Sequence, residues 1–289
     1  MALAIATNNA ALQAAAAASS VNRDMETSMA RLSSGKRINS AADDAAGVAI
    51  SSRLSAEIRG TDQAIRNALD GQALIDTAEG AHSEIENILQ RMREVSVQAA
   101  NDTNNDQDRS NLQAEMDAML TEIDRIAGTT TWAGASLMAD DAATTDFSFQ
   151  VGAATGTQNQ ITVNIAGMNG DALALSTTGT SDLDVTDGGN AGDAPVNALA
   201  SITLIDAAIK TVNIQRSELG AVSNRLSHTV NNLTNISSNL SAAKGGIEDA
   251  DFALETTNLA KNQILQQAST AMLAQANASK QNVLSLLQG

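Results

Sequence analysis

The chain has 289 residues, a formal net charge of −16 and no cysteine. The negative charge argues against nucleic acid as a partner, because such a surface needs an excess of lysine and arginine. The absence of cysteine excludes disulfides, thiolate catalysis and cysteine-ligated metals. Aromatic residues make up only 1% and proline occurs once. A chain of this kind, rich in Ala and Leu, favours long packed helices over an aromatic core.

Both ends of the chain are poor in charge. Residues 2–22 contain no Asp, Glu, Lys or Arg, and only Lys280 interrupts an uncharged run over 262–289. A soluble helix normally covers its outer face with charge, so both ends are predicted to become buried against other molecules. No segment is predicted to span a membrane, so no membrane insertion is expected, and no basic residue precedes the first run as in a signal peptide. Ser33-Ser34-Gly35 predicts the end of the first helix.

Heptad spacing is the strongest structural signal, and it predicts coiled-coil-like packing. The first two seams lie on either side of a polar break at 101–108, and the third spans 205–243. Ordering about 45 residues of a lone helix costs on the order of 65 kcal/mol, which its own seam cannot offset. Residues 44–128 and 199–245 are therefore predicted to form one antiparallel bundle. The bundle seam is represented by Ile85, Met92, Leu219, Leu226 and Leu233.

The middle of the chain, 129–198, has a different pattern. It holds no Lys or Arg and is rich in Gly, Thr, Asp and Asn. Apolar residues alternate with polar ones over 147–151 and again over 161–165, with glycines between, which predicts a β-hairpin. Residues 176–194 are predicted to be a loop.

The last segment is predicted to be a helix that begins after a stop at Gly245–Gly246. Asp249 or Asp251 is the candidate N-cap. Its apolar residues are the predicted self-assembly core, namely Leu265, Met272, Ala276, Val283, Leu286 and Leu287.

Chemically reactive patterns are weak, and no catalytic, cofactor-binding or metal-binding residue is predicted. His82 and His228 lie beside seams without a second ligand nearby, so both are interpreted as helix-surface or seam-edge residues. Asp43-Asp44 is interpreted as a helix cap. Four oxygen-bearing residues have calcium-loop spacing, namely Asn104, Asp106, Asp108 and Glu115, but Arg109 stands where such a loop needs glycine. The sequence favours a structural or interaction protein over an enzyme.

Several strings resemble the signatures of bacterial flagellins. The longest runs Arg31-Leu-Ser-Ser-Gly-Lys-Arg-Ile-Asn-Ser-Ala-Ala-Asp-Asp-Ala-Ala-Gly47. Others are Arg66-Asn-Ala-Leu-Asp-Gly71, Thr77-Ala-Glu-Gly80, Leu89-Gln-Arg-Met-Arg-Glu94 and the C-terminal Val283-Leu-Ser-Leu-Leu287. The resemblance covers roughly 1–130 and 200–289.

The resemblance implies a mainly α fold: a long antiparallel bundle with paired terminal helices and a small β-hairpin region. Residues 1–43 with 250–289 would form an inner domain, and 44–249 would form the helical bundle domain, with the hairpin and loop region at about 129–198. No large outer domain is expected.

The resemblance also implies a filament subunit for motility that is secreted unfolded and assembled at the filament tip outside the cell. Its implied partners are copies of itself, the flagellar cap, hook-junction proteins, a secretion chaperone and the export apparatus. Arg91 and Glu115 fall where related flagellins contact Toll-like receptor 5, and Val95 is a possible contact at a position where strongly recognised flagellins have Leu. A receptor ligand is therefore a coexisting interpretation. The alternative within the family is a hook–filament junction protein.

Overall fold

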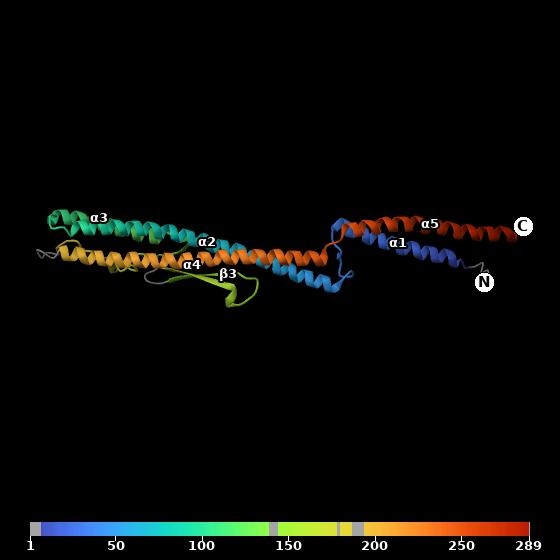
Figure 1. Ribbon diagram of the computed structural model, residues 1–289, viewed down its shortest axis with the longest axis horizontal. Coiled ribbons are helices and arrows are strands. Elements are labelled where there is room, and N and C mark those ends of the chain that lie inside the picture. Colours follow the sequence, from blue (N-terminus) through green and yellow to red (C-terminus); the bar gives the residue numbers. More distant parts are fainter. Residues whose placement is uncertain (1–6, 139–143, 178–179, 187–193, 289) are drawn as a thin grey trace. The chain divides into compact units, whose positions relative to one another are not determined.

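Long helices dominate the computed structural model, which describes residues 7–138, 144–177, 180–186 and 194–288. The helices are α1 (Asn9–Ser34), α2 (Ala45–Ala99), α3 (Asp106–Thr129), α4 (Ala194–Glu248) and α5 (Phe252–Gln288) (Figure 1). Between α3 and α4 lie β1 (Thr131–Trp132), β2 (Ala135–Ser136), β3 (Thr144–Gln150), a 3-10 turn η1 (Thr157–Asn159), β4 (Gln160–Ala166), β5 (Ser176–Thr177) and β6 (Thr180–Ser181). The predicted fold class, mainly α with a small β region, is confirmed.

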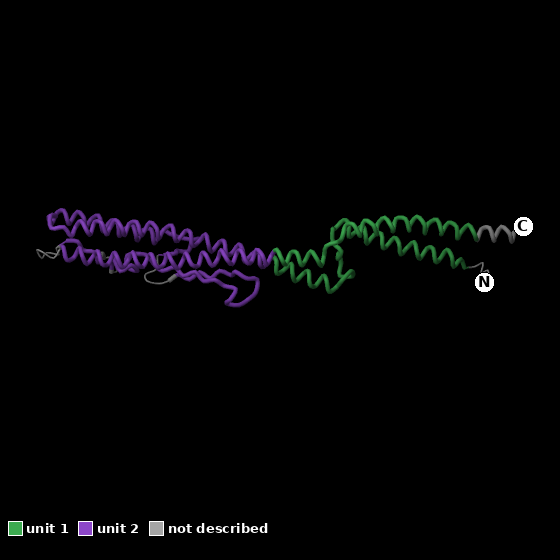
Figure 2. Tube along the Cα trace, viewed as in Figure 1, with its two compact units in different colours: residues 1–58, 238–289 green, residues 59–237 purple. Residues whose placement is uncertain are grey.

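The chain divides into two compact units, which are coloured separately in Figure 2. Unit 1 comprises 1–58 and 238–289, so its two segments come from opposite ends of the sequence. Unit 2 is the continuous stretch 59–237. The units divide the chain inside α2 and α4, whereas the predicted domain division at 43 and 250 falls close to helix ends. That division remains a prediction.

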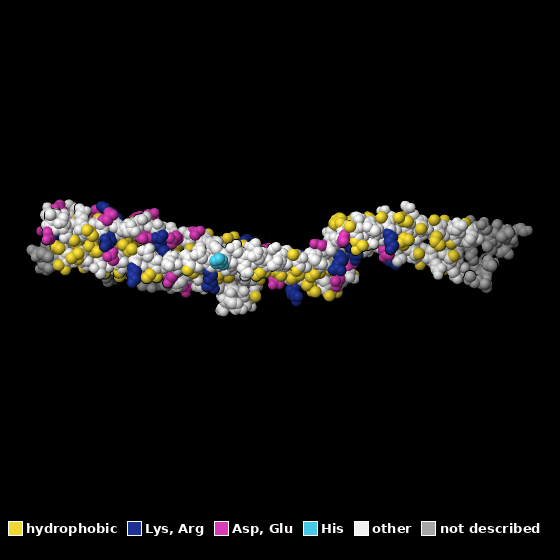
Figure 3. Space-filling model, viewed as in Figure 1, with side chains coloured by type: hydrophobic (Ala, Val, Ile, Leu, Met, Phe, Trp, Pro, Cys, Tyr) yellow, Lys and Arg dark blue, Asp and Glu magenta, His cyan; other side chains and the backbone are white. Residues whose placement is uncertain are grey.

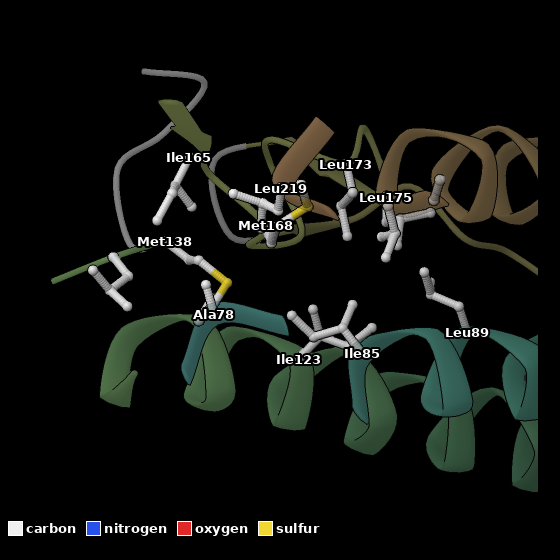
Figure 4. Packing of buried hydrophobic residues seen from close by; sticks show 14 of the residues in the cluster. Ala78, Ile85, Leu89, Ile123, Met138, Ile165, Met168, Leu173, Leu175 and Leu219 are labelled. Atoms are coloured by element: carbon white, nitrogen blue, oxygen red, sulfur yellow. The ribbon is translucent and has the colours of Figure 1, made fainter. Parts of the chain in front are cut away.

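Unit 2 is built around the predicted heptad seams. Apolar side chains of α2, α3 and α4 form one buried cluster with residues of the β region. In Figure 4, Ala78 and Ile85 of α2 and Ile123 of α3 point towards Met168 and Leu219. All of these are buried, and the helical ones share the inward face of their helix because residues three and four positions apart lie on one side of it. Around this cluster, Gln72 Nε2 donates to Ser227 Oγ at 2.7 Å and links α2 to α4.

The predicted β-hairpin is confirmed by the antiparallel pairing of β3 with β4. Phe147 lies opposite Val163 and Phe149 lies opposite Ile161. The inward row of β4 is buried while its alternate residues are exposed, as a strand with one covered face requires. Gln215 Nε2 of α4 donates to the Asn164 carbonyl at 2.8 Å, which fixes the hairpin against the bundle.

The prediction of a loop over 176–194 is wrong for 176–177 and 180–181, which form short strands, while 182–186 has no regular secondary structure. β5 pairs with β6, and Leu183 and Val185 are buried in the core of unit 2. Gln113 of α3 holds this stretch, because its side chain donates to the Leu183 carbonyl at 2.8 Å and accepts from the Val185 N–H at 3.0 Å. Two apolar residues in a run of Asp, Thr and Gly were too sparse to predict that this segment is buried. Residues 178–179 and 187–193 lie outside the described residues.

By length and composition, one helix in the described ranges, Pro195–Glu248, is apolar enough to cross a membrane. From its sequence, the chain is expected to contain no membrane-spanning segment. The apolar row of this helix is used inside unit 2, since Ile205, Val212, Leu219 and Leu226 are all fully buried or nearly so. The bundle core uses this part of its apolar character, whereas Val196, Leu199 and Ile214 are exposed.

In unit 1 the connection after α1 is paired with the connection after α4. Gly35 adopts a left-handed φ of 70° and ends α1 as predicted. The Arg37 N–H then donates to the Glu248 carbonyl at 2.6 Å, and the Ala250 N–H donates to the Gly35 carbonyl at 3.0 Å. A short antiparallel bridge thus joins segments more than 200 residues apart in sequence.

The predicted helix stop at Gly245–Gly246 is wrong, because α4 continues through both glycines to Glu248. Glycine weakens a helix but does not end one by itself. The helix ends where the backbone of Glu248 and Ala250 pairs with that of Arg37 and Gly35, so tertiary pairing decides the boundary. Asp251 begins the next helix, as one of the two predicted caps, by accepting from the Ala253 and Leu254 N–H groups.

Candidate assembly surface

The terminal helices of unit 1 expose an unusual amount of apolar surface. Figure 3 shows apolar side chains along α1 and α5 with few charged ones between them. A soluble monomer rarely exposes many large apolar side chains on one pair of helices. The exposed large apolar residues of these helices are Leu12, Met29, Phe252, Leu254, Ile264, Leu265 and Met272, with exposed fractions from 39% to 67%.

Alanine-rich composition and caps account for the helices themselves. Asn8 caps α1 by accepting from the Ala11 N–H at 3.1 Å, and Asp251 caps α5. Alanine has the highest helix propensity, so both segments favour helix without a core to support them. The helices then meet along their length, where Val21, Met25 and Leu273 are half-buried and polar contacts also link the pair.

Three polar links join α1 to α5. The Asn8 side chain donates to the Ala276 carbonyl at 3.2 Å, and Gln266 donates to Asn22 at 2.8 Å. Arg31 lies 4.0 Å from the buried carboxylate of Glu255. Within the described side chains, neither helix contributes a buried large apolar residue. Among the described side chains the pair therefore has half-buried but no fully buried large apolar residues, and many of its large apolar residues are exposed.

The predicted self-assembly residues lie on this surface as far as the structure describes them. Met272 is 67% exposed and Leu265 is 39% exposed, while Ala276 is half-buried. The backbone of Val283, Leu286 and Leu287 belongs to α5, but their side chains lie outside the described part of the chain.

Glu248 organises the polar cluster beside the bridge of unit 1. Its carboxylate accepts from Ser51 Oγ and pairs with Lys36 Nζ at 2.9 Å. The Ser51 hydrogen bond, followed by that of Lys36, lowers the pKa of Glu248. Arg37 adds a hydrogen bond of 2.7 Å to the Ile247 carbonyl. These contacts hold together the helix ends from which α1 and α5 extend.

The five predicted bundle-seam residues lie in unit 2 and are buried. Ile85, Met92 and Leu226 are fully buried, and Leu219 and Leu233 nearly so. They face the interior of the bundle and offer no surface to a partner.

The predicted receptor contacts have different surroundings. Arg91 and Glu115 are exposed and joined by an ion pair of 2.9 Å between α2 and α3, and Arg91 also pairs with Glu94. These carboxylates raise the pKa of Arg91, with the Glu115 hydrogen bond as the largest cause. Val95, in contrast, is fully buried. Its prediction as a contact is corrected, because a heptad seam position faces the core and leaves no side-chain surface.

The remaining polar candidates have structural surroundings. Asp44 accepts from the Gly47 N–H at 2.9 Å and caps the start of α2. Asp43 accepts from the N–H groups of Ser40 and Asn39, which lowers its pKa. His228 is exposed, but His82 is fully buried, so its interpretation as a surface or seam-edge residue is corrected.

Sequence reasoning missed the role of Arg109, which it treated only as the residue that spoils a calcium loop. Asn105 and Asp108 form a capping box at the start of α3. The buried Arg109 guanidinium donates to the carbonyls of Ala99 and Asn101 at 3.2 and 3.3 Å. It thereby satisfies acceptors at the end of α2 that a helix leaves unpaired. A cation one turn into a helix, directly after another helix ends, is the signal that could have indicated this.

Comparison with known proteins places these features in one family. Residues 5–143 match the bacterial flagellin N-terminal helical region, and 202–287 match the bacterial flagellin C-terminal helical region. The flagellin of Bacillus subtilis strain 168 is 45% identical over 97% of this chain and 98% of its own length. That of Halalkalibacterium halodurans is 45% identical over 91% of this chain and 92% of its own.

A solved structure shares the fold at lower identity. A putative flagellar hook-associated protein from Vibrio parahaemolyticus is 18% identical, with a TM-score of 0.59 over 72% of this chain and all of that one.

Proposed function

Since the chain belongs to the bacterial flagellin family, we propose that its exposed terminal helices drive assembly by packing against neighbouring copies. Family membership makes the protein a structural subunit of the flagellar filament and not an enzyme. The observation that carries the proposal is the exposed apolar surface of α1 and α5, which have no fully buried large apolar residue among their described side chains. Burying one large apolar side chain contributes about 1.5–3 kcal/mol, so even a few per subunit make a stable lateral contact.

Unit 2 supplies rigidity in this proposal. Its seams are filled and its surface carries ion pairs such as Arg93 with Asp206 at 2.6 Å. A packed interior resists deformation, so unit 2 can transmit torque between subunits while the terminal helices hold them together. Residues 1–43 with 250–289 remain the proposed inner domain.

The experiment is elongation of flagellar seeds by the purified full chain, followed by electron microscopy and turbidity. Met272→Glu places a charge on the exposed apolar face of α5 and is expected to abolish elongation, because burying an unpaired charge is costly. Met272→Leu keeps the face apolar and is expected to elongate like the parent chain. Wild-type elongation by Met272→Glu would show that this face stays in water and would overturn the proposal.

The partners outside the filament are part of the same proposal. Filament homologues imply a location outside the cell, and we propose export in the unfolded state with a chaperone, followed by insertion beneath the cap and next to hook-junction proteins. A discontinuous unit 1 supports this, because it cannot close before both chain ends are present. The likeness to a hook-associated protein concerns the fold alone, and the flagellin relatives favour the filament over the junction.

Recognition by Toll-like receptor 5 is a second proposal, supported by the exposed Arg91–Glu115 pair. Arg91→Ala and Glu115→Ala are expected to reduce the response of a receptor reporter line to the monomer. No response to the unmodified monomer would refute it.

A further inference from the structure

His82 is a buried titratable residue that assembly does not use. It lies in α2 and is fully buried in unit 2. Among the described residues, neither of its ring nitrogens has a hydrogen-bond partner. A neutral imidazole carries one donor and one acceptor, and burying both unpaired is costly. A protonated ring would be costlier still, because it would bring two unpaired donors and a charge into the bundle.

Arg216 of α4 bridges the two acidic residues that flank His82 on α2. Glu79, His82 and Glu86 lie three and four residues apart, so they share one stripe of α2. Arg216 Nε donates to Glu79 at 2.8 Å, and its Nη1 donates to Glu86. The guanidinium therefore spans the stripe from one side of His82 to the other. Glu79 and Glu86 of its own helix and Arg216 of α4 are the charged groups of this bridge, and of these Glu79 and Arg216 act on the ring.

We propose that His82 and the Arg216 bridge form an acid-triggered release point between α2 and α4. Protonation of the ring places a cation beneath a guanidinium in a dry seam, and the charge reaches water only if the two helices separate there. While Arg216 is bonded to both carboxylates, neither of them makes a hydrogen bond with the ring. The bundle of unit 2 thus loses stability in acid at a defined place.

The direction and size of the effect follow from linkage. Burial is the largest cause that lowers the pKa of His82, from 6.5 to about 4, and Arg216 lowers it further while Glu79 opposes. The unfolded chain takes up the proton first as the pH falls, so stability is complete above pH 6.5 and declines towards pH 4. Between pH 7 and pH 4.5 this residue alone raises the unfolding equilibrium constant by roughly 60-fold.

The test is urea unfolding of the full chain at pH 7 and pH 4.5, followed by the fluorescence of Trp132. This single tryptophan is half-buried against the core of unit 2. The parent chain and His228→Leu, which replaces the exposed histidine, are expected to show the acid loss. His82→Leu keeps the seam apolar. Its unfolding equilibrium constant is expected to rise roughly 60-fold less than that of the parent chain between pH 7 and pH 4.5. Equal acid losses in all three chains would overturn the proposal.

A second measurement covers the case in which His82→Leu does not fold. Histidine-selective NMR of the folded parent chain follows both rings, and His228→Leu identifies the His82 signal. That signal is expected to titrate near pH 4. In Arg216→Met the guanidinium is lost and Glu79 is released, so the titration midpoint of His82 is expected to move to a higher pH. A midpoint near 6.5 in the parent chain, or no shift in Arg216→Met, would overturn the proposal.

Discussion

Leu226→Ala tests the packing of unit 2 at the place where Leu226, Gly71 and Phe149 lie close together. Leu226 is fully buried, and a methyl group added at Gly71 would meet its Cδ1 and the ring of Phe149 at 3.3 Å. Removing three carbons from such a site typically costs about 2.7–5.0 kcal/mol, less where neighbours can collapse. The half-buried Phe149 and the absent side chain of Gly71 permit some collapse. The expected loss is therefore about 3 kcal/mol, near the lower end.

The assay is thermal and urea unfolding observed through Trp132. For a unit of this size a loss of about 3 kcal/mol lowers the midpoint temperature by roughly 6–12 °C. Leu69→Ala is the matched control on α2, since Leu69 is 47% exposed, and we expect it to cost less than about 1 kcal/mol. Equal losses for the two variants would contradict the packing described for the seam.

A double-mutant cycle with Gly71→Ala sharpens the prediction. In the parent chain the new methyl group meets Leu226 and Phe149, and that crowding offsets the gain in helix propensity of about 1 kcal/mol. In Leu226→Ala the methyl group enters space that the leucine has left, so the same change is expected to stabilise by about 1 kcal/mol. An identical effect of Gly71→Ala in both backgrounds would refute direct contact between the two positions.

Two further variants address the helix junctions. Arg109→Met removes the donors to Ala99 and Asn101 and is expected to destabilise unit 2 by about 2–3 kcal/mol in the same urea assay; the exposed Arg125→Met should change it by less than about 0.5 kcal/mol, and similar losses for both would contradict the role of Arg109. Glu248→Gln weakens the Ser51 and Lys36 contacts by about 1 kcal/mol, so the Arg37 amide is expected to exchange about 5-fold faster with deuterium. Because the pKa of Glu248 is lowered in the fold, its contribution is present above about pH 4.5 and is lost as the pH falls through the lowered value. An Arg37 exchange rate that Glu248→Gln leaves unchanged would contradict the role of this cluster.

The helices and their buried rows could be predicted because heptad spacing reports directly on which side of a helix faces a partner. Ile85, Met92 and Leu219 occupy the seam for that reason. The hairpin could be predicted because alternation over 147–151 and 161–165 has the period of a strand. The apolar, charge-poor face of α5 was equally visible in the composition of the last segment.

What could not be predicted depends on contacts between distant residues. Gly245–Gly246 has the local signature of a helix stop, but pairing with Gly35 and Arg37 sets the real end of α4. His82 looked like a seam-edge residue because its surroundings depend on Arg216, which is 134 positions away and bridges the acidic residues that flank it. Arg109 was hidden for a related reason, since its partners are backbone carbonyls, which carry no sequence signal.

The antiparallel bridge between Lys36 and Asp249 also fixes when unit 1 can form. Closing a loop of about 210 residues in an unfolded chain costs about 2 kcal/mol more than closing one of about 20. The contact moreover requires both of its strands to exist. While the chain is being synthesised, or is passing through a narrow channel amino terminus first, the first helix has no partner until the last residues arrive. The order of the sequence thus prevents α1 and α5 from pairing until both chain ends are present.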